Sequence, residues 1–453
     1  MGERKHMTCD VVVAGAGLAG VAAATAAARA GASVTIIERQ PFAGGVSTAG
    51  MEPCLCNFFI NTRHELVVGG RPLELVERMV KLGAASRNWH KHRGHVVFDV
   101  EIGKVAMDEM LEEAGVQILY GTLVTGVVTE GNRVTGLRIA NRSGEQTISA
   151  GCVVDATGDA DVASYAGAPL HVGSGQSMPH SFVFRLGNVD LDALAKYIRD
   201  NPSEYVSEGD IALTLDEALA FYEETGILYF MHFGAKKMQA IQEPIRRGEY
   251  SSNWGEFKNM DAFQMHGIRS SNTLVINTGF FTLHEPDGAQ LSHYLRRGRK
   301  MAQYVAGFLK THLPGCEKSF VAATANALGL RRTRWLKTEF VMTREIYDSA
   351  PRFPDAVGRG VLVGNRRLYV TDKTFDVPLR CLLPDDVDGL IIGSGRSTSS
   401  APAELLRVMP VTMIVGQGAG VAAAVSVRDG VVPRSVDIGA VQRELQAQGV
   451  SLD

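Results

Sequence analysis

The stretch that most constrains the fold of this chain lies near its start, where Asp10 opens the run DVVVAGAGLAGVAAATAAARAGASVTIIE. The apolar segment VVVA predicts a short buried strand, and it leads directly into a GxGxxG turn. The alanine-rich segment that follows predicts a helix capped by Gly31, and SVTIIE predicts a second strand ending in Glu38. This order of elements is typical of a dinucleotide-binding unit, in which the terminal acid accepts hydrogen bonds from ribose hydroxyls.

The three glycines of the turn have separate roles in such a unit. Gly15 permits the tight turn, Gly17 lets the backbone approach the pyrophosphate, and Gly20 lets the helix pack closely on the strand. Residues Ala22 to Arg29 are strong helix formers, and the N-terminus of this helix would face the phosphates with its unpaired N–H groups and positive dipole end. Leu18 and Ala19, which lie between the glycines, are expected to contact the cofactor as well. We therefore expect a dinucleotide site here rather than an ordinary glycine-rich loop.

The segment after Glu38, RQPFAGGVSTAG, indicates which dinucleotide binds. It resembles the FAD-dependent oxidoreductases of the two-dinucleotide-binding-domain type, in which the ribose acid is followed by Arg and then by Gly-Gly along the pyrophosphate and ribityl chain. The resemblance puts Arg39, Gly44 and Gly45 at those positions. It implies that Val46 and Ser47 approach the flavin ring.

A second group of cofactor contacts is expected about 140 residues further along the chain. The segment TLVTGVVTEGNRVTGLRIANRSGEQTISA alternates in short strands joined by turns and predicts a β-meander. The strand after it runs into the sequence DATGD. The resemblance implies that Ala156, Thr157 and Gly158 return the chain to the FAD, and we expect Val124 of the meander to be a further contact.

The C-terminal part of the chain, LRCLLPDDVDGLIIGSGRSTSSAPAELLRVMPVTMIVGQGAG, strengthens the resemblance. Its RCLLP segment, its strand ending in Gly-Arg, its RVMP turn and its glycine-rich helix are similar to the family called FAD dependent oxidoreductase, as are SFVFRLGNVD, FLKTHLPG and GLRRTRW. The similarity runs from residue 10 to about residue 427. It implies that Gly395 and Arg396 lie beside the ribityl chain and pyrophosphate, and that Arg407, Val408 and Met409 lie close to the flavin ring.

Residues 408–427 carry no charge, and a run of this length could cross a bilayer. Residues 11–28 are equally uncharged, so burial of both helices inside the nucleotide-binding domain explains both runs, and we expect no membrane span. The glycine cluster within 408–427 lacks the following strand and acid of a second dinucleotide unit. We therefore expect no NAD(P)H domain.

These patterns together predict an α/β fold. It has a Rossmann-like FAD-binding domain, with a parallel sheet and a β-meander, and an inserted α+β substrate or cap domain. The FAD-binding domain is expected to be discontinuous, at residues 8–55, 96–175 and 355–453. The cap domain is expected at residues 56–95 and 176–354.

Candidate catalytic residues lie in the middle of the chain and near its return to the nucleotide site. They are His180, His266, Arg331, Arg332 and Arg380. Arg331 lies in the family-like GLRRTR segment, and its guanidinium could hold a substrate carboxylate as a fork. Each of these residues also has an ordinary structural alternative, such as an ion pair with a neighbouring acid.

Composition limits the remaining possibilities. A formal net charge of −3 lacks the excess of positive charge that is typical of nucleic-acid-binding proteins. Six scattered cysteines and a charged start without a signal-peptide core favour a reducing, cytoplasmic setting. Cys54 and Cys56 are the close pair, and a redox role for them stays open. No second cysteine cluster completes a metal set, and His90, His92 and His95 lack a carboxylate at helical spacing, so we expect no metal site.

The function expected from these residues is hydride transfer between flavin N5 and a small organic substrate bound between the two domains. Non-covalent FAD is expected in preference to covalent FAD. The electron partner is left open among oxygen, a carrier protein and transiently bound NAD(P)H, and homo-oligomerisation is left open too. The alternatives are a lyase, an isomerase or a complex subunit with non-redox FAD, and a membrane-associated dehydrogenase.

Overall fold

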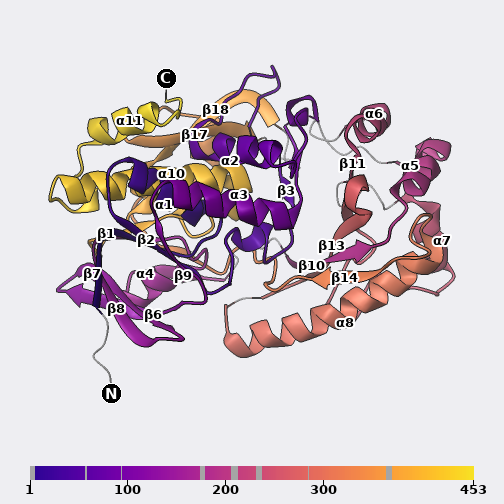
Figure 1. Ribbon diagram of the computed structural model, residues 1–453, viewed down its shortest axis with the longest axis horizontal. Helices are drawn as coiled ribbons and strands as arrows, with labels where there is room; N and C mark the ends of the chain where they lie inside the picture. The colour runs from indigo at the N-terminus through magenta and orange to yellow at the C-terminus, as the bar shows by residue number, and fades with distance from the viewer. Residues whose placement is uncertain are drawn as a thin grey trace.

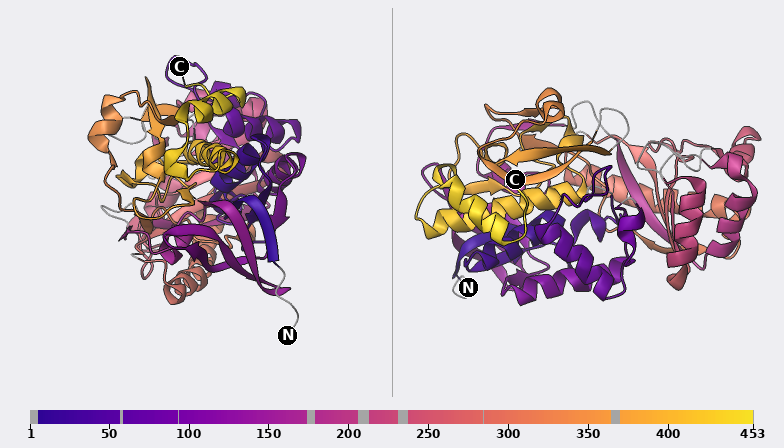
Figure 2. Two further views of the ribbon diagram at one scale, coloured as in Figure 1. Left: turned by 90° about the vertical axis from the view of Figure 1, so that its left-hand side faces the viewer. Right: turned by 90° about the horizontal axis from the view of Figure 1, so that it is seen from above.

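The computed structural model describes residues 6–56, 59–92, 94–173, 179–205, 213–230, 237–283, 285–363 and 370–452. They form two bodies that lie side by side, one around a seven-stranded sheet and one around a five-stranded sheet (Figure 1). The first body contains both ends of the described chain, and the second is made from its middle (Figures 1 and 2).

The seven-stranded sheet carries the predicted dinucleotide unit. Its parallel part has the order β5-β2-β1-β8-β19, and the meander of β6, β7 and β8 extends it with antiparallel strands. These strands are β1 (His6–Ala14), β2 (Val34–Ile37), β5 (Gln117–Leu119), β6 (Leu123–Glu130), β7 (Arg133–Asn141), β8 (Gly144–Asp155) and β19 (Leu390–Ile392). The predicted Rossmann-like sheet with a β-meander is thereby confirmed.

Two helices whose only charged residue is the arginine at the C-terminal end, α1 (Leu18–Arg29) and α10 (Met409–Arg428), lie against one another beside this sheet (Figure 1). A Cβ atom at Gly416 would come within 2.1 Å of the Ala19 carbonyl oxygen, and one at Gly420 within 2.1 Å of the Ala23 carbonyl oxygen. The glycines therefore allow backbone-to-backbone contact between the helices. Although α10 is long and apolar enough to cross a membrane, 89% of its most apolar window is buried inside the protein.

Further elements cover the helix layer of the first body. They are α2 (Gly70–Lys81), η2 (Trp89–His92), α3 (Val100–Glu113), α4 (Asp161–Tyr165), β16 (Met342–Thr343), α9 (Arg344–Ser349), β17 (Ala356–Val363), β18 (Val370–Pro378), η6 (Leu379–Leu382), β20 (Ser400–Ala401), η7 (Ala403–Leu405), η8 (Pro433–Ser435) and α11 (Ile438–Ala447). The core of this body includes residues of α2, α3, α9, β17, β18 and α11 together with those of α1 and α10.

Helix α2 packs into the first body, whereas the expected domain division grouped residues 56–95 with the cap. Leu75, Val76 and Met79 on its apolar face pack into the same core as α1 and α10, and the Arg71 N–H donates to Gln417 Oε1 at 2.9 Å. Met342 and Tyr347, from the later segment assigned to the cap, lie in that core as well. Sequence periodicity marks an apolar helix face but does not indicate which core it enters.

The second body, the cap, is an antiparallel sheet with helices on it. Its strand order is β11-β12-β13-β10-β14. The strands are β10 (His180–Gly187), β11 (Ile227–Phe230), β12 (Gln264–Ile268), β13 (Thr273–Phe281) and β14 (Phe320–Thr324). The other elements are α5 (Leu191–Asp200), η3 (Pro202–Glu204), α6 (Leu215–Thr225), α7 (Gln239–Arg246), η5 (Arg269–Ser271) and α8 (Gly288–His312). Helix α8, ended by Pro314-Gly315, runs along the sheet and buries Met301, Val305 and Leu309 against it (Figure 1).

Short elements connect the two bodies. They are η1 (Gly45–Ser47), β3 (Cys54–Leu55), β4 (Val96–Val97), β9 (Leu170–Val172) and β15 (Arg334–Leu336), with β3 paired to β4 and β9 to β15. The Asn326 and Ala327 N–H groups both donate to the Ala49 carbonyl oxygen, at 2.8 and 3.0 Å. Met51 enters the core of the cap. The loop expected beside the flavin is therefore fixed to the cap.

Candidate functional site

The glycine turn after β1 has the close contacts that its sequence predicts. A Cβ atom at Gly15 would lie 2.7 Å from the Ala156 carbonyl oxygen, and one at Gly20 would lie 1.8 Å from the Gly15 carbonyl oxygen. Helix α1 starts at Leu18, and its N-cap residue, Gly17, makes no side-chain cap. The first N–H groups of the helix, including those of Leu18 and Ala19, are therefore available to an anionic ligand such as a pyrophosphate.

Glu38 lies at the end of β2, where the ribose acid is expected, and is only 8% exposed. Its Oε2 accepts from the Ala16 N–H and its Oε1 from the Gln40 N–H, both at 2.8 Å. Each oxygen keeps a lone pair that a ribose hydroxyl could use. The Glu38 carbonyl accepts from the Thr122 N–H at 2.9 Å, which brings the beginning of β6, including Val124, to this end of the site. Arg39 beside it is exposed.

The Gly-Gly pair forms the next wall of the site. Gly44 and Gly45 both have left-handed φ angles, 109° and 57°, that favour glycine. Gly44 forms a bridge with Gly17, so the glycine turn and this loop run side by side. A short 3₁₀ turn, η1, follows, in which Ser47 Oγ donates to the Gly44 carbonyl and Val46 stays half-buried. Hydrogen bonds of its own backbone thus hold the loop next to the N-terminus of α1.

The DATG turn at the end of β8 meets the C-terminal part of the chain. Asp155 is fully buried and accepts from Thr157 N, Thr157 Oγ1 and Ala163 N, which fixes the turn around Ala156. Burial raises the pKa of the Asp155 carboxyl. Arg396 Nε donates to the Gly158 carbonyl at 3.2 Å. The two segments expected to border the FAD from opposite ends of the sequence are therefore in contact.

Arg396 makes further contacts within the protein besides the hydrogen bond to Gly158. Its guanidinium also donates to the Leu330 carbonyl, and its Nη2 lies 3.2 Å from Asp159 Oδ1. It therefore ties three segments together. Asp159, in turn, accepts from Thr333 Oγ1 at 2.6 Å.

Gly395 joins the same turn to the start of α10. Its N–H donates to Thr412 Oγ1 at 2.8 Å, and a Cβ atom there would lie 1.8 Å from the Leu406 carbonyl oxygen. Helix α10 begins after Val408, which makes no side-chain cap. Arg407 and Met409 on either side of Val408 are half-buried. These segments converge on the glycine turn, and their uncapped helix ends, glycine contacts and buried ribose acid fit a dinucleotide such as FAD.

Arg331 and Arg332 are neighbours in sequence but have different surroundings. Arg332 Nε donates to the Arg396 carbonyl at 3.0 Å and its Nη1 to the Ser400 carbonyl at 2.7 Å, so it braces the C-terminal turn. Arg331 is half-buried, and its Cζ lies 5.6 Å from the centre of the Phe280 ring. No carboxylate lies within ion-pair distance of it in the part of the chain that the structure describes, although the charge of Glu52 attracts it. Desolvation lowers the pKa of the Arg331 guanidinium. Arg331 is therefore the arginine suited to an anionic ligand.

His180 lies at the start of β10 and is 1% exposed. Its Nδ1 accepts from the Arg331 backbone N–H at 3.0 Å, and its Nε2 lies 3.0 Å from the Leu283 carbonyl, to which it can donate. Burial lowers the pKa of His180 to about 4, so the ring is neutral at pH 7. Both ring nitrogens are engaged by backbone, which favours a role in positioning Arg331. Direct contact of His180 with substrate stays a prediction.

His266, on β12, belongs to a polar cluster that the sequence did not reveal. We call Glu52, Gln264, His266 and Asn277 the interface cluster. His266 Nε2 lies 3.1 Å from Glu52 Oε1, and Asn277 Nδ2 donates to Glu52 Oε2 at 2.5 Å and to Gln264 Oε1 at 3.1 Å. Glu52 comes from the nucleotide-binding body, whereas the other three come from one face of the cap sheet.

Two buried atoms of the interface cluster, His266 Nδ1 and Asn277 Oδ1, have no hydrogen-bond partner among the residues described. A buried polar atom without a partner is costly, so such atoms need a ligand or an ordered water. Glu52 was missed because it follows the expected flavin loop in no recognisable motif. The signal that could have found the cluster is the alternation of Gln264 and His266 on an otherwise apolar strand.

The contacts of Arg380 include no member of the interface cluster among the described residues. It forms an ion pair with Asp355, and its Cζ lies 5.1 Å from the centre of the Phe340 ring and 5.4 Å from that of Phe353. Its side chain is 43% exposed. The ion-pair alternative is the arrangement that the structure contains, and a contact of Arg380 with substrate stays a prediction.

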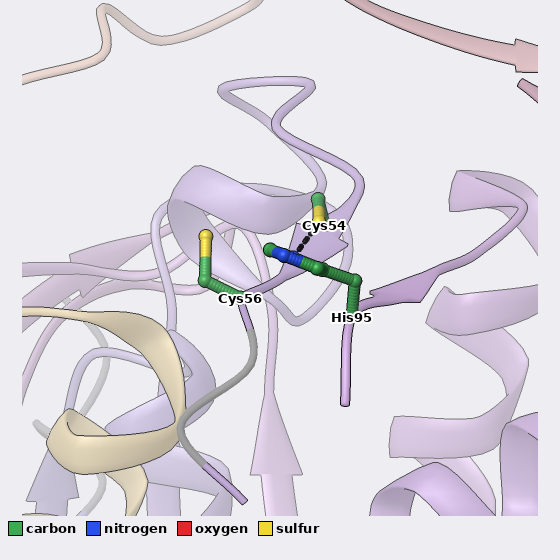
Figure 3. A group of neighbouring side chains, drawn as sticks. All are labelled: Cys54, Cys56 and His95. Atoms are coloured by element: carbon green, nitrogen blue, oxygen red, sulfur yellow. Dashed lines mark hydrogen bonds between the residues drawn. The ribbon is translucent and has the colours of Figure 1, made fainter. Parts of the chain in front are cut away.

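Cys54, Cys56 and His95 come together at the junction of the two bodies (Figure 3). Their donor atoms all lie within 4.8 Å of one another, and Cys54 Sγ lies 4.0 Å from His95 Nδ1. Interaction with the Cys54 thiol, aided by His95, lowers the pKa of Cys56 to about 5, while burial raises that of Cys54. This grouping reopens the question of a metal site, because the cysteines and histidines were considered separately in the sequence.

The fold and the geometry of the glycine turn are those of a dinucleotide-binding protein. The chain belongs to the family described as FAD dependent oxidoreductase, whose model matches residues 10–445.

Curated relatives match a smaller part of the chain. An Escherichia coli protein named "Probable electron transfer flavoprotein-quinone oxidoreductase" is 30% identical over 163 residues, covering 33% of this chain and 36% of the relative. A thiamine thiazole synthase from Aeropyrum pernix is 31% identical over 134 residues, covering 30% of this chain and 44% of the relative. The chain thus spans less than half the length of either relative.

Solved structures are similar at lower identity. A geranylgeranyl bacteriochlorophyll reductase-like protein from Thermoplasma acidophilum has a TM-score of 0.46 at 12% identity, covering 98% of this chain and 83% of that one. L-proline dehydrogenase from P. horikoshii has a TM-score of 0.40 at 12% identity, covering 97% and 99%. Similarity at this level transfers no substrate to this protein.

Proposed function

We propose that this FAD-dependent oxidoreductase transfers a hydride between flavin N5 and a small organic anion held between the nucleotide-binding body and the cap. The observation that carries the proposal is the position of Arg331. The segment around Arg331 is held at both ends. Before it, the N–H groups of residues 326 and 327 donate to Ala49 in the flavin loop. After it, Arg332 donates to the backbone carbonyls of residues 396 and 400 in the C-terminal turn.

Arg331 would anchor the substrate. Its backbone is held by His180. In the described ranges its guanidinium forms no ion pair at bonding distance, and Glu52 attracts it only through its charge. A guanidinium presents several N–H donors in one plane and so matches a carboxylate with two parallel hydrogen bonds. In a partly desolvated site such a pair is stronger than at the surface, because less water competes for the charges.

The interface cluster would handle a proton. With Nε2–H of His266 donating to Glu52, Nδ1 is left as an acceptor that can take a proton from a substrate hydroxyl or amine. Glu52 would orient the ring and stabilise the positive charge that then forms on it. Asn277 holds the other oxygen of Glu52 and so fixes the direction of the carboxylate.

FAD, when bound, supplies the hydride chemistry at its N5. We propose that the glycine turn of residues 15–20, Glu38, the loop of residues 39–47 and the turn of residues 156–158 hold its nucleotide part. Residues 395–396 and 407–409 would border the ring, with the N-terminus of α10 favouring negative charge there. Binding is proposed to be non-covalent, and no NAD(P)H domain is proposed.

We propose a domain division that follows the cores. The cap comprises the sheet β10–β14 with α5 to α8, and residues 56–95 and 334–354 join the FAD-binding domain. Electron acceptors remain oxygen, a carrier protein or transient NAD(P)H. The printed name of the Escherichia coli relative supports including an electron transfer flavoprotein among them.

The test is an anaerobic titration of the purified yellow protein with small carboxylates, such as 2-hydroxy and 2-amino acids, followed at the visible flavin bands. Bleaching by a substrate, reversed by an acceptor, supports the proposal. Product formation without bleaching would identify instead a lyase or isomerase with non-redox FAD. Bleaching only by neutral substrates would refute the role of Arg331.

A further inference from the structure

We propose that Cys54, Cys56 and His95 form a binding site for a thiophilic divalent cation, with Zn²⁺ as the reference ion. The site lies where the nucleotide-binding body meets the cap and is separate from the proposed FAD contacts. Thiolate and imidazole donors together select zinc and similar ions over hard cations such as Mg²⁺ or Ca²⁺.

The backbone places the three donors. Strands β3 and β4 pair antiparallel, with Cys54 opposite Val97 and Leu55 opposite Val96. Continuing that register by one residue sets Cys56 opposite His95. Because side chains alternate along a strand, Cys54 and Cys56 project from the same face of this strand pair, and so does His95. The grouping therefore follows from the pairing and does not depend on side-chain rotamers alone.

The spacing of the donors suits a metal ion. Zn–S bonds of about 2.3 Å and Zn–N bonds of about 2.1 Å put the donors of a tetrahedral site roughly 3.6–3.8 Å apart. Here Cys54 Sγ and His95 Nδ1 lie 4.0 Å apart, and all three donors lie within 4.8 Å of one another. The donors therefore lie within about an ångström of the separations that a tetrahedral site needs.

Two of the three donors of the cluster are fully enclosed, whereas Cys56 is half-buried. Cys54 is 0% exposed and His95 is 1% exposed. The ring of Tyr229, on cap strand β11, covers His95 at a centroid distance of 4.8 Å. The same ring lies 5.1 Å from the ring of His266, so the cluster is one aromatic ring away from the proposed proton-handling pair. An ion held here would brace the loop that carries Glu52 against the cap.

The experiment measures metal in the flavin-loaded, full-length protein purified without chelators under reducing conditions. After incubation with Zn²⁺ and gel filtration, we expect about one zinc per chain by mass spectrometry of the metal. His95→Ala and Cys56→Ser should each retain less than roughly a tenth of that amount, since each removes one of three ligands. Cys316→Ser, which alters a buried lone cysteine in the cap core, is the matched control and should keep the wild-type amount.

A second measurement needs no variant. X-ray absorption of the zinc-loaded wild type should give a shell of sulfur and nitrogen neighbours, and two thiols should be protected from a thiol reagent until a chelator is added. Zinc below a tenth of an equivalent in the wild type, or equal zinc in all variants, would overturn the proposal. So would a Cys54–Cys56 disulfide that takes up two further electrons per chain in a dithionite titration, because the pair would then be a redox couple.

Discussion

The nucleotide-binding turns and the interface cluster differ in what holds them. Around Gly15, Gly20 and Gly395, backbone meets backbone, and the contacts leave no room for a Cβ atom. In the interface cluster, side chains from two bodies meet, and two buried atoms lack partners among the described residues. The backbone of the first region is fixed by these contacts, so a ligand must match its existing shape. The second retains unsatisfied polar groups and so depends on what binds there.

The largest effect is expected where the backbone packing is tightest. Gly416→Ala puts a Cβ atom 2.1 Å from the Ala19 carbonyl oxygen and should destabilise the fold by about 3 kcal/mol, with loss of bound flavin. Gly307→Ala is the matched control, because a Cβ atom there meets nothing within 4 Å on an exposed face of α8. That change should stabilise slightly, by about 0.5–1 kcal/mol. Urea unfolding and flavin content would measure both, and a native-like Gly416→Ala would contradict the packing.

An intermediate effect is expected at the proposed anchor. Arg331→Gln should lower kcat/KM for a carboxylate substrate about 100-fold, mostly through KM, because a charge-assisted pair is lost. Arg199→Gln, at an exposed ion pair with Glu223 in the cap, is the control and should change kcat/KM less than about twofold. Steady-state kinetics with unchanged flavin spectra would test this. Equal losses in Arg331→Gln and Arg380→Gln would show that the anchor has been wrongly assigned.

The smallest effect is a pH dependence of stability at His180. Its pKa is about 4 in the folded protein against 6.5 for an ordinary histidine, so the unfolded state binds the proton more readily. The stabilisation is therefore complete above about pH 6.5 and is lost as the pH falls toward 4. Between pH 7 and 4.5 this contributes roughly 2 kcal/mol. The free energy of unfolding of His180→Gln should lack that part of the pH slope; identical slopes would argue against a buried neutral ring.

The same comparison explains how much the sequence could predict. The strand, glycine turn, helix and acid of residues 10–38 form a local pattern, and the structure places each element as expected. The meander and the buried helix from residue 409 follow from local patterns too. Whether Arg331 or Arg332 faces a ligand could not be predicted, because that depends on carbonyl groups more than sixty residues away.

Features that depend on two distant segments were missed for the same reason. Glu52 meets residues of β12 and β13, and the ion pair of Asp159 with Arg396 joins two segments far apart in the chain. The strand pair that brings His95 to Cys54 and Cys56 consists of two strands of only two residues each, which are too short to show a periodicity in the sequence. The placement of α2 failed because an apolar helix face fits either core.

The contact between α1 and α10 also determines the order of events during synthesis. Ala19 meets Gly416, so the surface of α1 that packs on α10 has no native cover until almost four hundred further residues have been made. At ribosomal rates this exposure lasts on the order of tens of seconds. The middle of the chain, with its own antiparallel sheet and core, can fold during that interval, whereas the parallel sheet must wait for β19. The two helices at the centre of the nucleotide-binding body therefore meet only after the cap between them in the chain has been made.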